Sequence, residues 1–275
     1  MSTARPLKAK NAIDEIAFVV VFERELDDKT LISLFALRDE LGESLPDFEI
    51  VNQVKFVVDN QNPQMPISKS GGVLLSKKNA ADLSRFEWSL RVETNKITVG
   101  CSEFTDWDIV WATAKQYLFA AMSKFDTNIN PVVEVMLRVV DKFIDDADLK
   151  AYQIGNIFDV ESRYLSRNLV DLNTSSWHLH QGWFMYPDNT DIRALHNLNI
   201  NALKPDDKFH ETVVSHLIKV RRCDETAVVK KSVLLGEEGA VGHIEQAMIE
   251  SHKANKKVLM GLLNQSMLTA IGMRE

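Results

Sequence analysis

Apolar and polar residues alternate most strictly between residues 86 and 93. Phe86, Trp88, Leu90 and Val92 are separated by polar or charged residues, which is the period of two that a half-buried strand shows. A turn at residues 94–96 and further alternate apolar positions predict a hairpin partner that ends at Cys101. Residues 13–22 are apolar on both faces, which instead predicts a strand covered on both sides.

A second pattern is an apolar stripe at helical spacing near the end of the chain. Its members recur every three or four residues and are Ile244, Ala247, Met248, His252, Asn255, Val258, Leu259, Leu262, Leu263, Met267 and Ile271. They predict one helix from about Gly242 to Ile271. About 28 residues at about 1.5 Å each make a rod of roughly 42 Å.

The predicted rod is longer than one small sheet is wide, since four strands at about 4.8 Å spacing cover only about 19 Å. We therefore expect the stripe to be covered by another lobe, by a second copy of the chain, or by another protein. The interface residues predicted on this argument are Met248, His252, Leu259, Leu262, Leu263 and Met267. Within that contact, His252 is predicted to be a buried neutral imidazole and not a catalytic group.

The order of the remaining patterns predicts an α+β protein of two lobes, each a mainly antiparallel sheet covered by helices. Residues 1–11 are predicted to be a disordered arm, 12–145 the N-terminal lobe, 146–174 a connector, and 175–275 a C-terminal antiparallel sheet with the long helix. The last lobe contains three strand-like segments, at 177–186, 192–202 and 212–222, which predict an antiparallel meander. Residues 225–241 fit a fourth strand or a helical turn.

Two helices are predicted in the N-terminal lobe. One starts after Asp27 or Asp28 and ends at Gly42, because an acidic cap precedes its stripe and a glycine follows it. The other starts after Thr105 and carries Trp107 and Trp111 on one stripe. We expect both tryptophans to anchor this helix against the sheet.

Composition narrows the class of protein. The 275 residues carry a net charge of −7, so a nucleic acid would bind only at a local basic patch. The two cysteines, Cys101 and Cys223, are far apart in the sequence, which suggests neither a disulfide framework nor a cysteine metal site. No apolar run has the length of a signal peptide core or a membrane span, and we expect a cytoplasmic protein.

Three stretches of the chain resemble a known family. They are residues 133–141 (VEVMLRVVD), the Trp88 hairpin before a tryptophan-bearing helix, and the terminal segment with His252, Leu262 and Leu263. Together they are similar to a sporadically distributed bacterial family of uncharacterised function, over most of the chain. The usual Leu-Arg-Tyr-Ile-Asn strand of that family lacks its tyrosine and asparagine here. The resemblance implies a two-lobed bacterial protein with the patchy occurrence of mobile-element and phage-defence genes, and it supplies no catalytic residues.

The sequence lacks the common signatures of nucleotide-binding loops, nucleophilic serines and zinc proteases, each of which needs fixed spacing. Weak candidates for a metal site are four histidines on predicted strands, His178, His180, His196 and His216. Because no carboxylate or cysteine at a suitable spacing completes that set, we expect no metal and no cofactor. Asp145, Asp146 and Asp148 are interpreted as solvated loop acids.

Basic residues gather on the last predicted strand and just after it. They are Lys219, Arg221, Arg222, Lys230 and Lys231, and without interleaved aromatics they suit an acidic protein surface as well as a nucleic acid. The leading hypothesis is therefore a non-catalytic interaction protein that binds itself or another protein, and not a membrane. Two alternatives remain: a metal-dependent hydrolase or nuclease that uses the histidines, and a nucleic-acid-binding protein that uses the basic strip.

Overall fold

The computed structural model describes residues 4–55, 58–59, 62–63, 67–127, 129–146, 152–172, 174–186, 192–204, 209–222 and 242–273. These residues fold into an α+β protein with mainly antiparallel strands. The chain divides into two compact units, each discontinuous in sequence. Unit 1 comprises Met1–Ile16, Met136–Cys223 and Glu245–Glu275, and unit 2 comprises Ala17–Val135 and Asp224–Ile244. The lobes predicted from the sequence were instead continuous segments, because sequence patterns carry no information on which distant segments pack together.

Unit 2 places a five-stranded sheet against one long helix. Its elements are β2 (Ile13–Phe22), α1 (Asp28–Ser33), η1 (Leu34–Ala36), α2 (Leu37–Leu41), β3 (Asp47–Lys55), β4 (Val58–Asp59), β5 (Asn62–Pro63), β6 (Ile67–Lys78), β7 (Phe86–Glu93), β8 (Lys96–Cys101) and α3 (Trp107–Met122). The strands follow the order β2-β8-β7-β6-β3, and β4 pairs separately with β5. The predicted hairpin of β7 and β8 is confirmed, with Trp88 opposite Cys101.

Trp111 anchors α3 on this sheet as predicted, because it is buried and its ring lies 5.4 Å from the ring of Phe18 on β2. The predicted cap of this helix was wrong by one residue. Asp106, and not Thr105, is the N-cap, since its side chain accepts a hydrogen bond from the backbone N–H of Asp108. Asp27 caps α1 in the predicted way, with Thr30 N–H as the donor.

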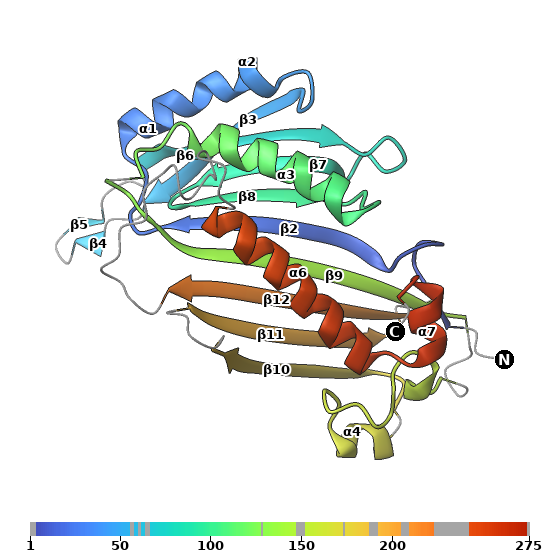
Figure 1. Ribbon diagram of the computed structural model, residues 1–275. Helices are drawn as coiled ribbons and strands as arrows, with labels where there is room; N and C mark the ends of the chain where they lie inside the picture. Colours follow the sequence, from blue (N-terminus) through green and yellow to red (C-terminus); the bar gives the residue numbers. More distant parts are fainter. Residues whose placement is uncertain are drawn as a thin grey trace. The chain divides into compact units, whose positions relative to one another are not determined.

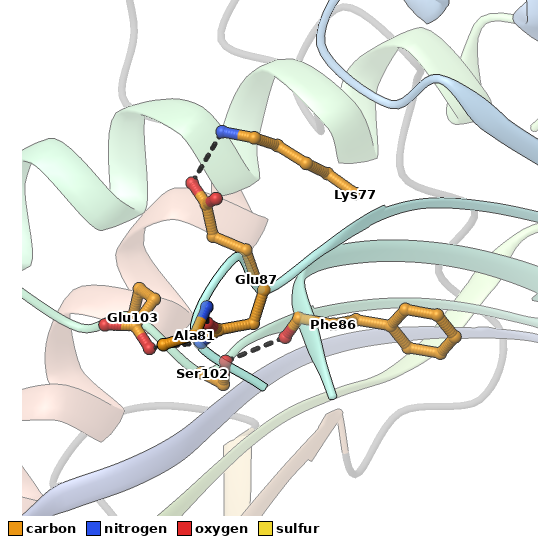
Figure 2. A network of polar contacts seen from close by, with 7 residues as sticks. Lys77, Ala81, Phe86, Glu87, Ser102 and Glu103 are labelled. Carbon is orange, nitrogen blue, oxygen red and sulfur yellow. Dashed lines mark hydrogen bonds and ion pairs between the residues drawn. The ribbon is translucent and has the colours of Figure 1, made fainter. Parts of the chain in front are cut away.

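A network of polar contacts fixes the connection between β6 and β7 (Figure 2). Asn79 donates to Glu103 over 2.5 Å and accepts from the backbone N–H of Ala81 over 2.8 Å. Ser102 donates to the Phe86 carbonyl oxygen over 2.7 Å. Since Asn79 and Ser102 are buried, these bonds satisfy groups that would otherwise be costly to remove from water. The network thus ties residues 79–86 to the residues that follow β8.

Unit 1 repeats the plan of a meander followed by a helix. Its elements are β1 (Ala4–Pro6), β9 (Val132–Asp145), η2 (Ile154–Asn156), α4 (Arg167–Leu172), β10 (Trp177–Met185), β11 (Ile192–Leu203), β12 (His210–Arg222), α6 (His243–Leu262) and α7 (Gln265–Ala270). The strands follow the order β10-β11-β12-β9, and β1 pairs with β9. The predicted meander of β10, β11 and β12 is confirmed. In unit 2 the last strand of the meander, β8, lies beside β2, and in unit 1 the last strand, β12, lies beside β9.

The arm predicted for residues 1–11 is not wholly disordered. Ala4–Pro6 forms β1, which pairs antiparallel with residues 143–145 of β9, and Pro6 is buried. A strand edge offers unpaired backbone groups to any nearby segment, and these residues use that edge although their sequence has no strand pattern. The prediction missed β1 because such pairing is not local.

The predicted single helix from Gly242 to Ile271 is wrong. Helix α6 ends at Leu262, Leu263 forms a β-bridge with Phe158, and Asn264 takes an extended conformation that caps α7. Asn264 accepts from the N–H of Met267 and donates to the carbonyl oxygen of Gly155. The break therefore results from backbone and side-chain bonds to the segment 155–158, which the helical spacing of the stripe does not reveal.

Candidate functional site

The predicted interface stripe lies inside unit 1. Five of its members, Met248, Leu259, Leu262, Leu263 and Met267, are at most 2% exposed. The last four pack in the core of unit 1 with Phe143, Phe158, Trp177, Leu198 and Ile200, and Figure 1 shows α6 crossing the strands of this unit. His252 is half-buried. The strands of unit 1 cover the apolar stripe that was predicted to be an interface.

Strands β10, β11 and β12 have two different faces, which we call inward and outward. The inward face meets α6 and holds the buried residues His196, Leu198 and Ile200 of β11. The outward face holds the alternate residues, and none of those described on these three strands is buried. Among the described residues the outward face is therefore the one that a ligand can reach.

The inward histidines form a closed polar chain. Nδ1 of His196 lies 3.1 Å from Nε2 of His216, and Nδ1 of His216 lies 2.9 Å from Oδ1 of Asn255 on α6. Burial lowers the pKa of His196 to about 4. Burial also lowers the pKa of His216 to about 4, although the hydrogen bond that His216 forms with Asn255 acts in the opposite direction. Both imidazoles are thus neutral near pH 7. With one N–H each, His216 donates to Asn255 and His196 donates to His216.

The four predicted metal candidates are divided between the two faces. His178 and His180 of β10 are exposed on the outward face, whereas His196 and His216 are buried on the inward face. Residues directly opposite each other on paired strands share a face, and His196 lies opposite Trp183. His178 and His180 are an odd number of residues from Trp183, so they face the other side. Among the residues that the structure describes, no group of three or more His, Cys, Asp or Glu side chains is placed to hold a metal.

The prediction that Asp145, Asp146 and Asp148 are solvated loop acids is wrong for Asp145, which ends β9 inside the fold. Asp145 is fully buried and accepts a hydrogen bond from Asn156 Nδ2 over 2.9 Å. Asp146 lies 3.6 Å from the guanidinium of Arg5. Asp148 is outside the described residues. Of the cysteines, Cys101 is a buried free thiol, as a small core residue is expected to be.

Asp141 on β9 is a buried acid that the sequence analysis did not single out. It is 2% exposed, and its Oδ2 has no hydrogen-bond partner within the described part of the chain. On the neighbouring strand β12, Ser215 and Glu211 contact Arg138 and Lys142 of β9. Burial raises the pKa of Asp141 to about 7. Its only advance signal is a charged residue at an inward position.

Three cations gather at one end of the outward face. Arg193 of β11 is directly opposite Arg221 of β12, and Lys219 lies opposite Leu195. None of these three cations forms an ion pair with an acid among the residues described here. Like charges directly opposite on neighbouring strands repel and destabilise the pair. Of the other predicted basic residues, Arg222 ends β12 with its side chain outside the described set, and Lys230 and Lys231 lie outside the described residues.

Two aromatic rings lie among these cations. Phe184 is opposite Leu195 and is 52% exposed, and Tyr186, just after β10, is 63% exposed. Their ring centroids are 6.5 Å apart, and the guanidinium of Arg193 lies 5.3 Å from the Phe184 centroid. We call these five residues, Phe184, Tyr186, Arg193, Lys219 and Arg221, the cationic patch. Sequence reasoning found Lys219 and Arg221 but missed the other three, because they come from two other strands.

Asparagines and histidines line the middle of the outward face, beside the apolar Val213 and Leu217 of β12. Asn197, Asn199 and Asn201 alternate along β11, opposite Gly182, His180 and His178 of β10. Nδ1 of His178 lies 2.6 Å from Oδ1 of Asn201. At the far end of this face Lys142 pairs with Glu211 over 3.1 Å, so these two charges neutralise each other.

No family model, curated protein or solved structure matches this chain. In the described part of the chain, no helix is both long and apolar enough to cross a membrane.

Proposed function

We propose that the outward face of β10, β11 and β12 binds single-stranded nucleic acid at the cationic patch. The observation that supports this proposal is the directly opposed pair Arg193 and Arg221, unpaired with described acids and placed beside the exposed rings of Phe184 and Tyr186. An anionic ligand relieves the repulsion between the two guanidinium groups, because each phosphate interacts favourably with both.

The aromatic rings favour a nucleic acid over an acidic protein surface. Proteins that bind single strands combine a positive surface for the phosphates with aromatic rings on which bases stack. Phe184 and Tyr186 are exposed and lie within 6.5 Å of each other, so they can accept neighbouring bases. A duplex keeps its base faces inside its own stack, which makes the single strand the better match.

Because the net charge of the protein is −7, we expect a nucleic acid to bind at the cationic patch and not over the rest of the surface. Phosphates are repelled by most of an acidic surface and attracted only where cations are unpaired. A nucleic-acid ligand also agrees with the mobile-element or phage-defence setting that the family resemblance implies. That setting stays a prediction. The alternative of a metal-dependent hydrolase loses support, since the histidines lie on opposite faces.

The salt dependence of binding gives a quantitative test. Three cations that each neutralise one phosphate predict a slope of log K against log salt of about −2, from about −0.7 per contact on single strands. A fourfold rise in salt, from about 50 to about 200 mM, should then weaken binding by roughly 20-fold. We propose to measure this by fluorescence anisotropy with a labelled oligothymidylate of about 20 nucleotides, longer than the roughly 4–16 nucleotides of one small site.

Variants of the patch separate the two contributions. Arg221→Gln should reduce the slope by about 0.7, and Phe184→Ala should weaken binding by about 1–3 kcal/mol with the slope unchanged. Matched controls are Lys256→Gln, an exposed cation on α6, and Phe209→Ala, an exposed ring before the start of β12. The proposal is refuted if the wild type does not bind, or if the patch variants behave like the controls.

A further inference from the structure

Gly182 interrupts the side-chain layer of the outward face in the middle of β10. It lies directly opposite Asn197, and a Cβ atom at this position would be 2.9 Å from Asn197 Oδ1 and 3.3 Å from the carbonyl oxygen of His196. Glycine weakens a strand because it orders a flexible backbone and packs no side chain. Inside a strand it commonly marks a place where a ligand or another backbone approaches closely.

The groups around Gly182 suit a flat ligand with hydrogen-bonding edges. His180 and Phe184 lie two residues away on β10, at about 6.7 Å along the strand, and Asn197 and Asn199 lie on the neighbouring strand. Neither asparagine amide has a hydrogen-bond partner within the described residues. An amide can donate and accept at once, as recognition of a base edge requires. Phe184 also belongs to the cationic patch, so this group of residues continues that surface.

We propose that Gly182 allows a nucleobase to lie against the backbone of β10, with Phe184 stacking on it and the amides of Asn197 and Asn199 bonding its edge. This inference rests on the proposed function and adds a base-recognition subsite to the phosphate contacts. The patch cations then hold the backbone of the strand, and the neutral part of the face holds a base. The ligand is thus bound through its bases as well as through its charge.

The experiment compares two oligomers of equal length and charge, oligothymidylate and a fully abasic phosphodiester. The wild type should bind the base-containing oligomer about 10-fold or more tightly than the abasic one, since one stacked base contributes roughly 5- to 150-fold. Gly182→Val should remove most of this preference while leaving affinity for the abasic oligomer and the salt slope unchanged. A valine side chain occupies the position that the base would take.

Asn199→Ala tests the same subsite without the risk that a β-branched residue at position 182 disturbs the strand. Its amide has no bond to a described residue, so its removal should leave thermal unfolding unchanged and reduce the preference for bases by about 3- to 10-fold. Gln246→Ala, on the exposed face of α6, is the matched control. If the wild type prefers the base-containing oligomer but Gly182→Val and Asn199→Ala both keep that preference, the base subsite is overturned and the proposed function is left intact. Failure to bind either oligomer would overturn the proposed function itself.

Discussion

Replacing Asp141 with Asn should stabilise the protein at alkaline pH. Asp141 is 2% exposed and its Oδ2 has no hydrogen-bond partner in the described residues, so the folded protein holds its carboxyl group in the neutral form more easily than in the charged form. Burial raises the pKa of Asp141 from 3.8 to about 7. Asparagine has nearly the same shape and cannot ionise.

The sign of the effect follows from the direction of the shift. The pKa of Asp141 is higher in the folded protein than in the unfolded chain. The contribution of Asp141 to the free energy of unfolding is therefore fully present below about pH 4 and is lost as pH rises through about 7. A shift of about three units corresponds to about 4 kcal/mol at pH 8 and to about 2 kcal/mol at pH 5.5. The Asp141→Asn variant should therefore gain most at pH 8 and little near pH 4.

Urea unfolding of both proteins at several pH values between 5 and 8.5 measures the difference directly. Subtracting one curve from the other cancels the contribution of His196 and His216, whose lowered pKa values make both proteins lose stability as pH falls. Asp39→Asn, at an exposed carboxylate of α2, is the control and should show no pH-dependent gain. If Asp141→Asn is no more stable than the wild type at pH 8, the carboxyl group of Asp141 is stabilised in its charged form by a partner or by water.

Two further predictions concern buried contacts. Asn255→Ala should cost about 1–3 kcal/mol in the free energy of unfolding, because it leaves Nδ1 of His216 buried without an acceptor; calorimetry against the exposed neighbour variant Lys256→Ala checks this, and equal stability would mean that water replaces the amide. Trp111→Ala should cost about 3–5 kcal/mol, the usual loss for a large buried aromatic, whereas Ile109→Ala on the exposed side of α3 should cost far less in the same urea titration. A Trp111 variant with an unchanged unfolding midpoint would contradict its role as the anchor of α3.

The histidines illustrate what sequence patterns can and cannot predict about a site. All four candidates do lie on strands, and the spacing of His178 and His180 places them on one face as expected. Their separation from His196 and His216 depends on the register in which β10 pairs with β11, and a shift of one residue exchanges the faces. Register is set by contacts between strands and cannot be read from one strand.

The cationic patch depends on tertiary structure for the same reason. The basic residues of β12 were visible in the sequence, but Arg193 and Phe184 become their neighbours only when β10 and β11 pair with β12. The two aromatic rings then change the interpretation, because cations alone suit an acidic protein as well as a nucleic acid. The decisive residue types come from three segments that are separate in the sequence.

The sequence by itself determined the α+β class, the β7–β8 hairpin, the β10–β12 meander and the anchoring of α3 by Trp111. These features depend on short-range periodicity, since a strand or a helix shows which positions are buried within a few residues. Tertiary structure alone decided the pairing of β1 with β9, the break after Leu262 and the burial of the terminal stripe within unit 1. Each of these is a contact between distant segments, whose free energy depends on packing partners that no local pattern identifies.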